Sequence, residues 1–329
     1  MSDNRFDFLE IGDARPPRTA TAPPRAPGPG VQTPPIGMPR EEPAPDEREW
    51  RVVEVIGERG AGFGQFAAPG GLAVDIGGSL YVADSYNHRI QRITSGGDVT
   101  PLGARGNRNG QFLNPQAVVV DLELRIYVLE QGNSRVQVFS SEGEHLGTFG
   151  GQGGALSQFH GPTGMALAPC GSLFIADAGN RRVSKWARYG QPIALIAQSP
   201  TAGSFFGSPQ GVAVDQSGRI FVADRQRHAL LVFNAAFQPV AQVGGFGIGR
   251  GQFNEPQDVA LDTDGLIFVA EAGNNRLQIL DPRGRSMQII SDAGDLGDFS
   301  APTGVAVGRN GSVYLADTGN HRVFRLERI

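Results

Sequence analysis

From Trp50 onward, short apolar runs alternate with turns rich in glycine and proline, and the alternation has a fixed period. A pattern of Phe, two residues, Pro, one residue, usually Gly, and then an apolar run occurs six times. The steps between successive prolines are 46, 47, 47, 47 and 46 residues. These prolines are Pro69, Pro115, Pro162, Pro209, Pro256 and Pro302. Such regular spacing is the mark of a tandem repeat array.

A second marker follows each proline at the same spacing. An apolar run ends in an acidic residue, and a short turn then leads in most copies to Asn, any residue, Arg and an apolar residue. The acidic residues are Asp84, Glu130, Asp177, Asp224, Glu271 and Asp317, again separated by 46, 47, 47, 47 and 46 residues. Because two separate markers recur with the same spacing, the repeat is not a chance similarity.

Each repeat reads as four short strands. In the first copy, residues 72–74, 80–83 and 89–93 are apolar, β-branched or aromatic, and glycines lie between the first two runs. Residues 146–150 and 239–244 show the fourth strand of later copies. Four antiparallel strands per repeat are typical of a propeller blade, so we expect an all-β, six-bladed β-propeller.

The two ends of the array predict how the ring closes. The last repeat stops after its third strand, over residues 323–329, and has no fourth strand of its own. Residues 51–57, before the first complete repeat, match the fourth-strand pattern and end in glycine. We therefore expect residues 51–57 to be the outer strand of the last blade.

The N-terminal part has a different composition. Residues 15–46 hold eleven of the 23 prolines, which favours an extended, unpacked chain. We therefore expect a disordered, Pro-rich tail over residues 1–49 and the propeller over residues 50–329. The short apolar segment 6–11 is either a docking peptide for a partner or an ordinary part of the disordered terminus.

The turn after each acidic residue resembles the signature of the NHL repeat family. Residues 84–90 (Asp-Ser-Tyr-Asn-His-Arg-Ile) and 317–323 (Asp-Thr-Gly-Asn-His-Arg-Val) match it closely, while residues 130–136, 177–183 and 271–277 match with substitutions. Residues 224–230 (Asp-Arg-Gln-Arg-His-Ala-Leu) lack both the Asn and the Arg. The resemblance implies a six-bladed propeller that acts as a scaffold. Because residues 224–230 depart from the signature, we expect any unusual surface or blade interface in the fourth blade.

We assign the signature residues a structural role. The acid ends one strand and the arginine begins the next, so a charge-assisted hydrogen bond between them, within or between blades, would fix the turn. The arginines in question are Arg89, Arg135, Arg182, Arg276 and Arg322. His88, His228 and His321 occupy a turn position where the family often has histidine, and we assign them to the turn as well.

The strand order predicts where a binding site would lie. The segment that leads into the first strand and the turn between the second and third strands belong to the same face. The residue after each repeated proline should therefore line the mouth of the central channel. These residues are Gly70, Gln116, Thr163, Gln210, Gln257 and Thr303. They form a ring of mostly neutral hydrogen-bonding groups, which suits water or a polar ligand but not a metal or an acid–base pair.

The resemblance also suggests an enzymatic alternative. Propeller lyases such as the peptide-amidating lyase use a ring of histidines around zinc near this channel, and none of the six positions here is His. His160 and Asp258 could form a constellation across the mouth. Phosphate-binding, nucleophile-elbow and zinc-protease motifs are absent from the sequence, so we expect no cofactor and no metal.

Charge and cysteine content add weak constraints. The chain carries a formal net charge of −4; residues 1–49 hold 6 Arg and 9 acids, a net of −3, which leaves −1 for residues 50–329. The single cysteine, Cys170, excludes an intrachain disulfide and a cysteine zinc site. With no apolar run long enough to span a membrane and no secretory signal, we expect a cytoplasmic, monomeric protein that does not bind membranes.

Three functions remain open. The leading hypothesis is a non-catalytic binding or scaffold module that contacts a protein partner through one face. The alternatives are an enzyme of the lyase or hydrolase type and a propeller that binds single-stranded RNA. RNA binding would use a local basic patch, and its candidates are Arg105, Arg108, Arg225, Arg227 and Arg250.

Overall fold

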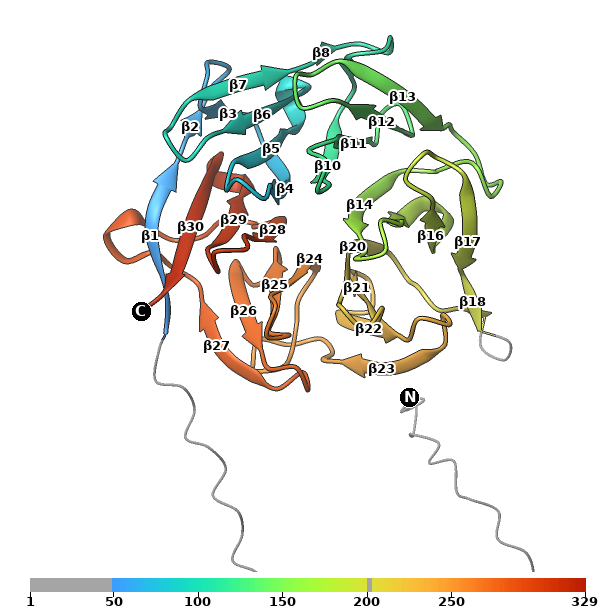
Figure 1. Ribbon diagram of the computed structural model, residues 1–329. Coiled ribbons are helices and arrows are strands. Elements are labelled where there is room, and N and C mark those ends of the chain that lie inside the picture. Colours follow the sequence, from blue (N-terminus) through green and yellow to red (C-terminus); the bar gives the residue numbers. More distant parts are fainter. Residues whose placement is uncertain (1–48, 200–202) are drawn as a thin grey trace, which may run out of the picture. The chain divides into compact units, whose positions relative to one another are not determined.

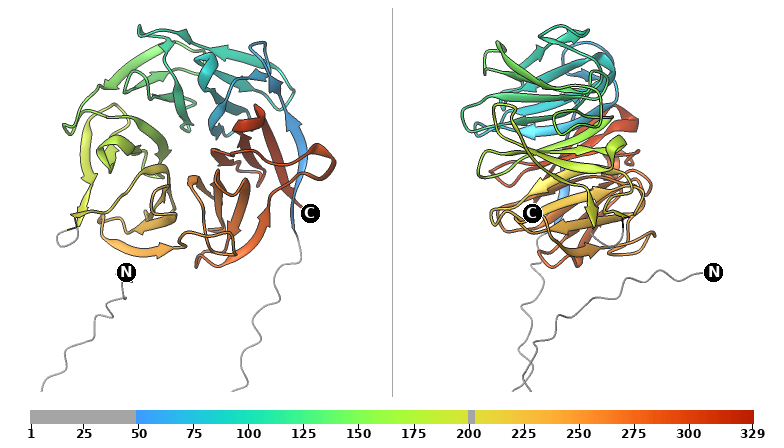
Figure 2. Two further views of the ribbon diagram at one scale, coloured as in Figure 1. Left: turned by 180° about the vertical axis from the view of Figure 1, so that it is seen from behind. Right: turned by 90° about the vertical axis from the view of Figure 1, so that its right-hand side faces the viewer.

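The computed structural model describes residues 49–199 and 203–329, which lie in one compact unit. In this unit, six four-stranded antiparallel sheets are arranged radially around a central axis (Figures 1 and 2). The expected six-bladed β-propeller is therefore confirmed. The predictions made for residues 1–48, including the segment 6–11, lie outside the described residues.

In each blade the strands follow the chain from the axis outward, except for the outer strand of the sixth blade (Figure 1). Blade one consists of β4 (Pro69–Val74), β5 (Leu80–Asp84), β6 (Arg89–Ile93) and β7 (Val99–Leu102). Blade two consists of β10 (Pro115–Val120), β11 (Ile126–Glu130), β12 (Arg135–Phe139) and β13 (His145–Gly150). Blade three consists of β14 (Pro162–Leu167), β15 (Leu173–Asp177), β16 (Arg182–Trp186) and β17 (Pro192–Ile196).

The remaining blades repeat this plan. Blade four consists of β20 (Pro209–Val214), β21 (Ile220–Asp224), β22 (Ala229–Phe233) and β23 (Pro239–Val243). Blade five consists of β24 (Pro256–Leu261), β25 (Ile267–Glu271), β26 (Arg276–Leu280) and β27 (Ser286–Ile290). Blade six consists of β28 (Gly304–Val307), β29 (Val313–Asp317), β30 (Arg322–Arg328) and β1 (Trp50–Ile56).

Small elements lie in the segments that connect the blades and in the turns. Short strand pairs are β2 (Glu58–Arg59) with β3 (Gln65–Phe66), β8 (Ala104–Arg105) with β9 (Gln111–Phe112), and β18 (Gln198–Ser199) with β19 (Gly203–Ser204). The 3₁₀ turns are η1 (Ser85–Asn87), η2 (Ala178–Asn180), η3 (Gly294–Leu296) and η4 (Thr318–Asn320). None of the helical segments in the described part of the chain is long and apolar enough to cross a membrane.

Strand β1 closes the ring as the sequence predicts. It pairs antiparallel with β30 from Trp50 opposite Arg328 to Ile56 opposite Val323, with a bulge between Val52 and Glu54. Its first residue is also held by blade five, because the side chain of Gln288 both accepts from the N–H of Trp50 and donates to its carbonyl oxygen. The closing strand is thus anchored to two blades.

The core is divided among the six interfaces between neighbouring blades. Each interface has its own cluster of buried apolar side chains, and the cluster between blades six and one joins Tyr314 and Ala316 to Leu72 and Val82. The phenylalanine that precedes each repeated proline is buried in one of these clusters. These residues are Phe66, Phe112, Phe159, Phe206, Phe253 and Phe299. A single blade cannot bury this surface alone, which is why the array must close.

Candidate functional site

The signature turn is a tight connection between the second and third strands of each blade. In blade one, β5 ends at Asp84, η1 makes one turn, and His88 adopts a left-handed conformation with φ of 56° before β6 begins at Arg89. The hydrogen bond from the N–H of Tyr86 to the carbonyl oxygen of Ala67 joins this turn to the segment that leads into β4. Turn and lead-in segment therefore share one face, which we call the signature face.

The acid of each signature is a buried structural anchor. The carboxylate of Asp84 accepts hydrogen bonds from the N–H of Ala67 at 2.7 Å, from the side chain of Asn87 at 2.8 Å and from Nε of Arg89 at 2.8 Å. Equivalent acid–arginine pairs of 2.6–2.8 Å join Glu130 to Arg135, Asp177 to Arg182, Glu271 to Arg276 and Asp317 to Arg322. Each pair lies within one blade, and all six acids, Asp224 included, are fully buried.

The guanidinium fork also holds the lead-in segment. In blade three, Nη1 and Nη2 of Arg182 donate to the carbonyl oxygens of Gly154, Ala155 and Gln158. The side chain therefore fixes a loop that has little regular structure of its own. Such planar, multidentate binding suits arginine and not lysine.

A buried glutamine completes this network, and the sequence analysis missed it. Nε2 of Gln91 donates to Asp84 and to the carbonyl oxygen of Gln65, while its Oε1 accepts from the N–H of Gly64. Gln137 and Gln278 make the same set of contacts in blades two and five. The signal was present, because Gln stands two residues after the signature Arg in these three copies.

In blade four, different residues bond the buried acid and hold the signature turn. Asp224 is buried and accepts hydrogen bonds from the N–H groups of Gly207 and Ser208. Arg227, at the position of the signature Asn, donates to the carbonyl oxygen of Ser204 and lies 4.0 Å from Asp224. Arg227 thus takes over part of the role of the missing arginine. The departure that the sequence shows is therefore a local substitution within an intact turn.

The turn histidines connect neighbouring blades. Nδ1 of His88 accepts from the N–H of Asn114, Nδ1 of His228 from that of Glu255, and Nδ1 of His321 from that of Ala68. Burial, followed by the charge of Arg105, lowers the pKa of His88, which suits an acceptor nitrogen. The structural role expected for these three histidines is consistent with this geometry.

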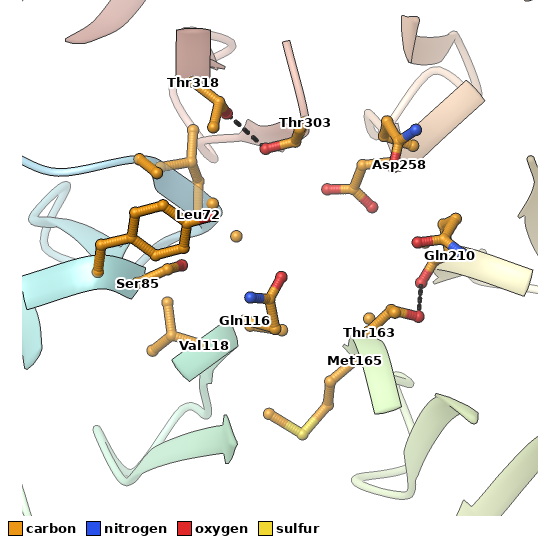
Figure 3. A pocket seen from close by; sticks show the side chains of 18 residues that line it. Leu72, Ser85, Gln116, Val118, Thr163, Met165, Gln210, Asp258, Thr303 and Thr318 are labelled. Atoms are coloured by element: carbon orange, nitrogen blue, oxygen red, sulfur yellow. Dashed lines mark hydrogen bonds between the residues drawn. The ribbon is translucent and has the colours of Figure 1, made fainter. Parts of the chain in front are cut away.

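A cavity of about 190 Å³ lies on the axis at the signature face. The six residues that follow the repeated prolines all line it, together with Asp258, Thr318 and, deeper along the strands, Leu72, Val118 and Met165 (Figure 3). Tyr86 also lines the cavity and is largely exposed to solvent, so the cavity meets solvent at this face. Whether these residues bind a ligand stays a prediction.

Most hydrogen-bond donors in the wall are already used. Thr163 donates to the carbonyl oxygens of Pro209 and Gln210, and Thr318 donates to that of Pro69. Thr303 shares a hydrogen bond with Thr318 at 2.5 Å (Figure 3). The bonds of Thr163 and that of Thr318 to Pro69 join one blade to the next, while Thr303 and Thr318 bond within blade six.

Asp258 is the one carboxylate in the described lining of this cavity. Its Oδ1 accepts from the N–H of Val259 at 2.9 Å, and its Oδ2 accepts from the N–H of Val305 in blade six at 3.0 Å. Figure 3 shows the carboxylate pointing into the cavity. Burial raises the pKa of Asp258 to about 7, although these two N–H groups oppose the shift.

His160 and Asp258 do not come together. The ring of His160 packs on Gly179 in the signature turn of blade three and is absent from the described lining of the cavity. Within residues 49–199 and 203–329, no group of three His, Cys, Asp or Glu side chains is placed to hold a metal ion. The constellation considered for an enzyme is thus not assembled here.

The five arginines proposed for a basic patch differ in their contacts. Arg225 forms an ion pair with Glu255 at 2.8 Å, Arg250 donates to the carbonyl oxygen of Met287, and Arg227 is engaged in the blade-four turn. Arg105 and Arg108 are exposed on the segment that leads into blade two. Three of the five arginines therefore already bond other residues of the protein.

Comparison by sequence identifies the repeats. The NHL repeat family model matches residues 66–93, 206–233, 253–280 and 299–326, which fall in blades one, four, five and six. Blade four is matched although its turn lacks the Asn and Arg. No curated protein matches the chain in sequence.

Comparison by structure returns other propellers. A protein of unknown function from Bacteroides thetaiotaomicron has a TM-score of 0.70 at 16% identity, covering 86% of this chain and 77% of that one. A gluconolactonase from Xanthomonas campestris has a TM-score of 0.61 at 14% identity, covering 81% and 88%. Virginiamycin B lyase from Staphylococcus aureus has a TM-score of 0.55 at 14% identity, covering 78% and 80%. At these identities the likeness shows the fold alone.

Proposed function

Because this chain is an NHL-repeat protein folded as a six-bladed β-propeller, we propose that it is a non-catalytic binding module that docks a protein partner on its signature face. The observation that carries the proposal is a set of large apolar side chains left exposed on that face. Fold alone would not suffice, since propellers host many functions.

These exposed side chains lie on consecutive blades. Phe246 and Ile248 precede blade five and are 71% and 81% exposed. Leu296 precedes blade six and is also exposed. Phe63 precedes blade one, Tyr86 lies in its signature turn, and they are 71% and 69% exposed. Exposed aromatic and aliphatic side chains beside polar loops are typical of surfaces that bind proteins.

The chemistry of the same face supports binding more than catalysis or RNA recognition. The cavity wall offers neutral amides, hydroxyls and one carboxylate, without a nucleophile–base pair among the described residues. Of the arginines suggested for RNA, Arg225 is neutralised by Glu255. We also propose that the protein acts as a monomer in the cytoplasm, because β1 completes the sixth blade and the one cysteine, Cys170, is free.

The test is affinity capture from a lysate with three forms of the full-length chain: wild type, a Phe246→Ser/Ile248→Ser variant and an Ile76→Ser/Leu122→Ser control. Ile76 and Leu122 are exposed on turns between first and second strands, which lie on the opposite face. We expect a protein that the wild type and the control retain and that the first variant loses. Retention by all three forms would contradict docking on the signature face.

Two further captures, one after nuclease treatment and one with a variant that lacks residues 1–45, test for RNA binding and for a contribution of the tail. Loss of the captured protein after nuclease would favour the RNA-binding alternative. Capture that also requires residues 1–45 would show that the tail contributes to binding in addition to the propeller.

A further inference from the structure

Asp258 departs from the rule that the innermost strands follow. At the same position the other five blades have Gly71, Ala117, Gly164, Gly211 and Gly304. Small residues are needed there because neighbouring inner strands lie close together: a Cβ on Gly164 would meet the carbonyl oxygen of Gln210 at 2.2 Å. Asp258 is accommodated because its carboxylate reaches the N–H of Val305 across the interface between blades five and six.

The two hydrogen bonds of Asp258 leave part of the carboxylate unused. A carboxylate offers about four acceptor positions, and the N–H groups of Val259 and Val305 occupy two of them. A neutral Asn could accept only one of these bonds, because its second terminal atom is a donor. The carboxylate points into the cavity (Figure 3).

No positive charge in the described structure faces this carboxylate. Strand β24 carries no other titratable side chain, and β20 and β28 carry none. On β25 the titratable residue is Glu271, which is paired with Arg276. In the described lining of the cavity, the other titratable side chain is Tyr86, and there is no Lys, Arg or His.

The glutamines of the polar wall each use one of their two side-chain N–H donors on a neighbouring residue. Nε2 of Gln116 donates to Asn114, Nε2 of Gln210 to Ser208, and Nε2 of Gln257 to the carbonyl oxygen of Glu255. Their Oε1 atoms have no hydrogen bond from another described residue. The cavity therefore presents one carboxylate among neutral amide groups and no cation in its described lining, an environment that favours a positively charged ligand.

We propose that this cavity binds an ammonium or guanidinium group, the end of a lysine or arginine side chain of the docked protein, with Asp258 as its counter-ion. The inference rests on the proposed function, since the side chain belongs to the partner. A volume of about 190 Å³ holds such a group, because a water molecule takes roughly 30 Å³. The apolar side chains of Leu72, Val118 and Met165 line the same cavity and can contact the aliphatic part of such a side chain.

The first experiment uses small probes. N-acetyl-arginine methylamide and N-acetyl-lysine methylamide are titrated into the full-length protein, with N-acetyl-citrulline methylamide as the uncharged isostere of arginine. The amide resonances of Val259 and Val305 report on the site, because both N–H groups bond the carboxylate. We expect both cationic probes to shift these resonances and to bind at least about tenfold more tightly than citrulline. Equal binding of citrulline would overturn the proposal.

A matched pair of variants identifies the counter-ion. Asp258→Asn keeps the shape, removes the charge and replaces one of the two acceptor oxygens with an NH₂ group. Asp264→Asn makes the same change of side chain on an exposed turn of the opposite face. We expect Asp258→Asn to weaken the cationic probes at least about tenfold and Asp264→Asn to leave them unchanged. For the wild type, affinity should rise about tenfold from pH 6 to pH 8 as Asp258 ionises. Undiminished binding by Asp258→Asn would overturn the proposal.

A captured partner distinguishes the source of the cation. If a lysine or arginine of the partner enters the cavity, Asp258→Asn should weaken the partner while the Asp264→Asn control retains it. Probe binding with a partner unaffected by Asp258→Asn would instead assign the site to a free amine and overturn the side-chain assignment. Failure of the probes with a partner still held by Phe246 and Ile248 would overturn this inference and leave the proposed function standing.

Discussion

At the scale of single residues, Arg182 shows how the signature stabilises the fold. Its side chain is 6% exposed, it pairs with the fully buried Asp177 at 2.7 Å, and it donates to three carbonyl oxygens of the lead-in segment. Arg182→Ala would leave a buried carboxylate without its counter-ion. We expect a loss of about 3–5 kcal/mol in the free energy of unfolding, measured by urea denaturation.

The control for this change is an exposed pair. Arg219 bonds Asp215 at 2.6 Å but is 44% exposed, so Arg219→Ala should cost less than about 1 kcal/mol. Arg182→Lys, which keeps the charge but not the fork, should fall between the two alanine variants. Equal losses for Arg182→Ala and Arg219→Ala would show that the buried network does not hold the blade.

Asp258 gives a second prediction, based on its pKa. Burial raises this pKa to about 7 in the folded protein, whereas an unfolded aspartate titrates near 3.8. Between these values the folded state binds the proton more tightly, so the contribution of Asp258 to stability is greatest at low pH and is lost as pH rises through about 7. From pH 5 to pH 8 the wild type should lose about 3 kcal/mol relative to Asp258→Asn.

Urea denaturation of both proteins at the two pH values measures this difference. Taking the difference between the two proteins removes the titration of all other groups that they share. A constant difference between wild type and Asp258→Asn across this range would mean that the carboxylate is not enclosed as the structure indicates.

At the residue scale, the sequence predicted which residues line the cavity, but it did not predict how deeply Asp258 is buried among them. The six residues after the prolines follow from strand order, because alternation and turn length fix which side chains reach the axis. The enclosure of Asp258 does not follow from its own repeat. It depends on Gly211 and Val305, which belong to the two neighbouring blades.

At the scale of elements, the deletion of β1 is expected to have the largest effect on stability. It supplies the outer strand of blade six, and Trp50 packs edge-on against Phe268 of blade five with ring centres 5.2 Å apart. Deleting residues 50–57 should abolish cooperative unfolding, because β30 would lose its partner and the cluster between blades five and six would open. Deleting residues 1–45 should leave cooperative unfolding intact, and calorimetry of the two truncations distinguishes these outcomes. Equal melting of both truncations and the full chain would contradict the role of β1.

Elements were predictable where side chains show a period and less so where they do not. The closing strand was expected at residues 51–57 and is found at Trp50–Ile56, because it is rich in β-branched residues and is followed by the glycine that ends the fourth-strand pattern. The first strand of blade one was expected to begin at residue 72 but begins at Pro69. Gly70 and Gly71 have no side chains to show a period, and the register is irregular between Pro69 and Leu72.

At the scale of the whole molecule, the two ends of the described chain meet. Glu49 and Ile329 exchange backbone hydrogen bonds in both directions, beyond the pairing of Trp50 with Arg328. Five blades form from consecutive residues, whereas the sixth must bring together segments that lie at opposite ends of the sequence. Loop-closure entropy opposes such a long-range contact and slows its formation.

A circular permutant tests how much this long-range pairing slows folding. The permutant begins at Glu58 and joins Ile329 through a short glycine-rich turn to residues 49–57, so that all six blades become local hairpin sheets. Because the same contacts form in both proteins, we expect a single cooperative transition and the same β-sheet circular dichroism spectrum. Refolding from urea should be faster, since the permutant closes blade six without a long loop. Slower refolding, or two separate transitions, would mean that β1 does more than complete the sixth sheet, and that its long-range pairing organises the ring before the other blades have stacked.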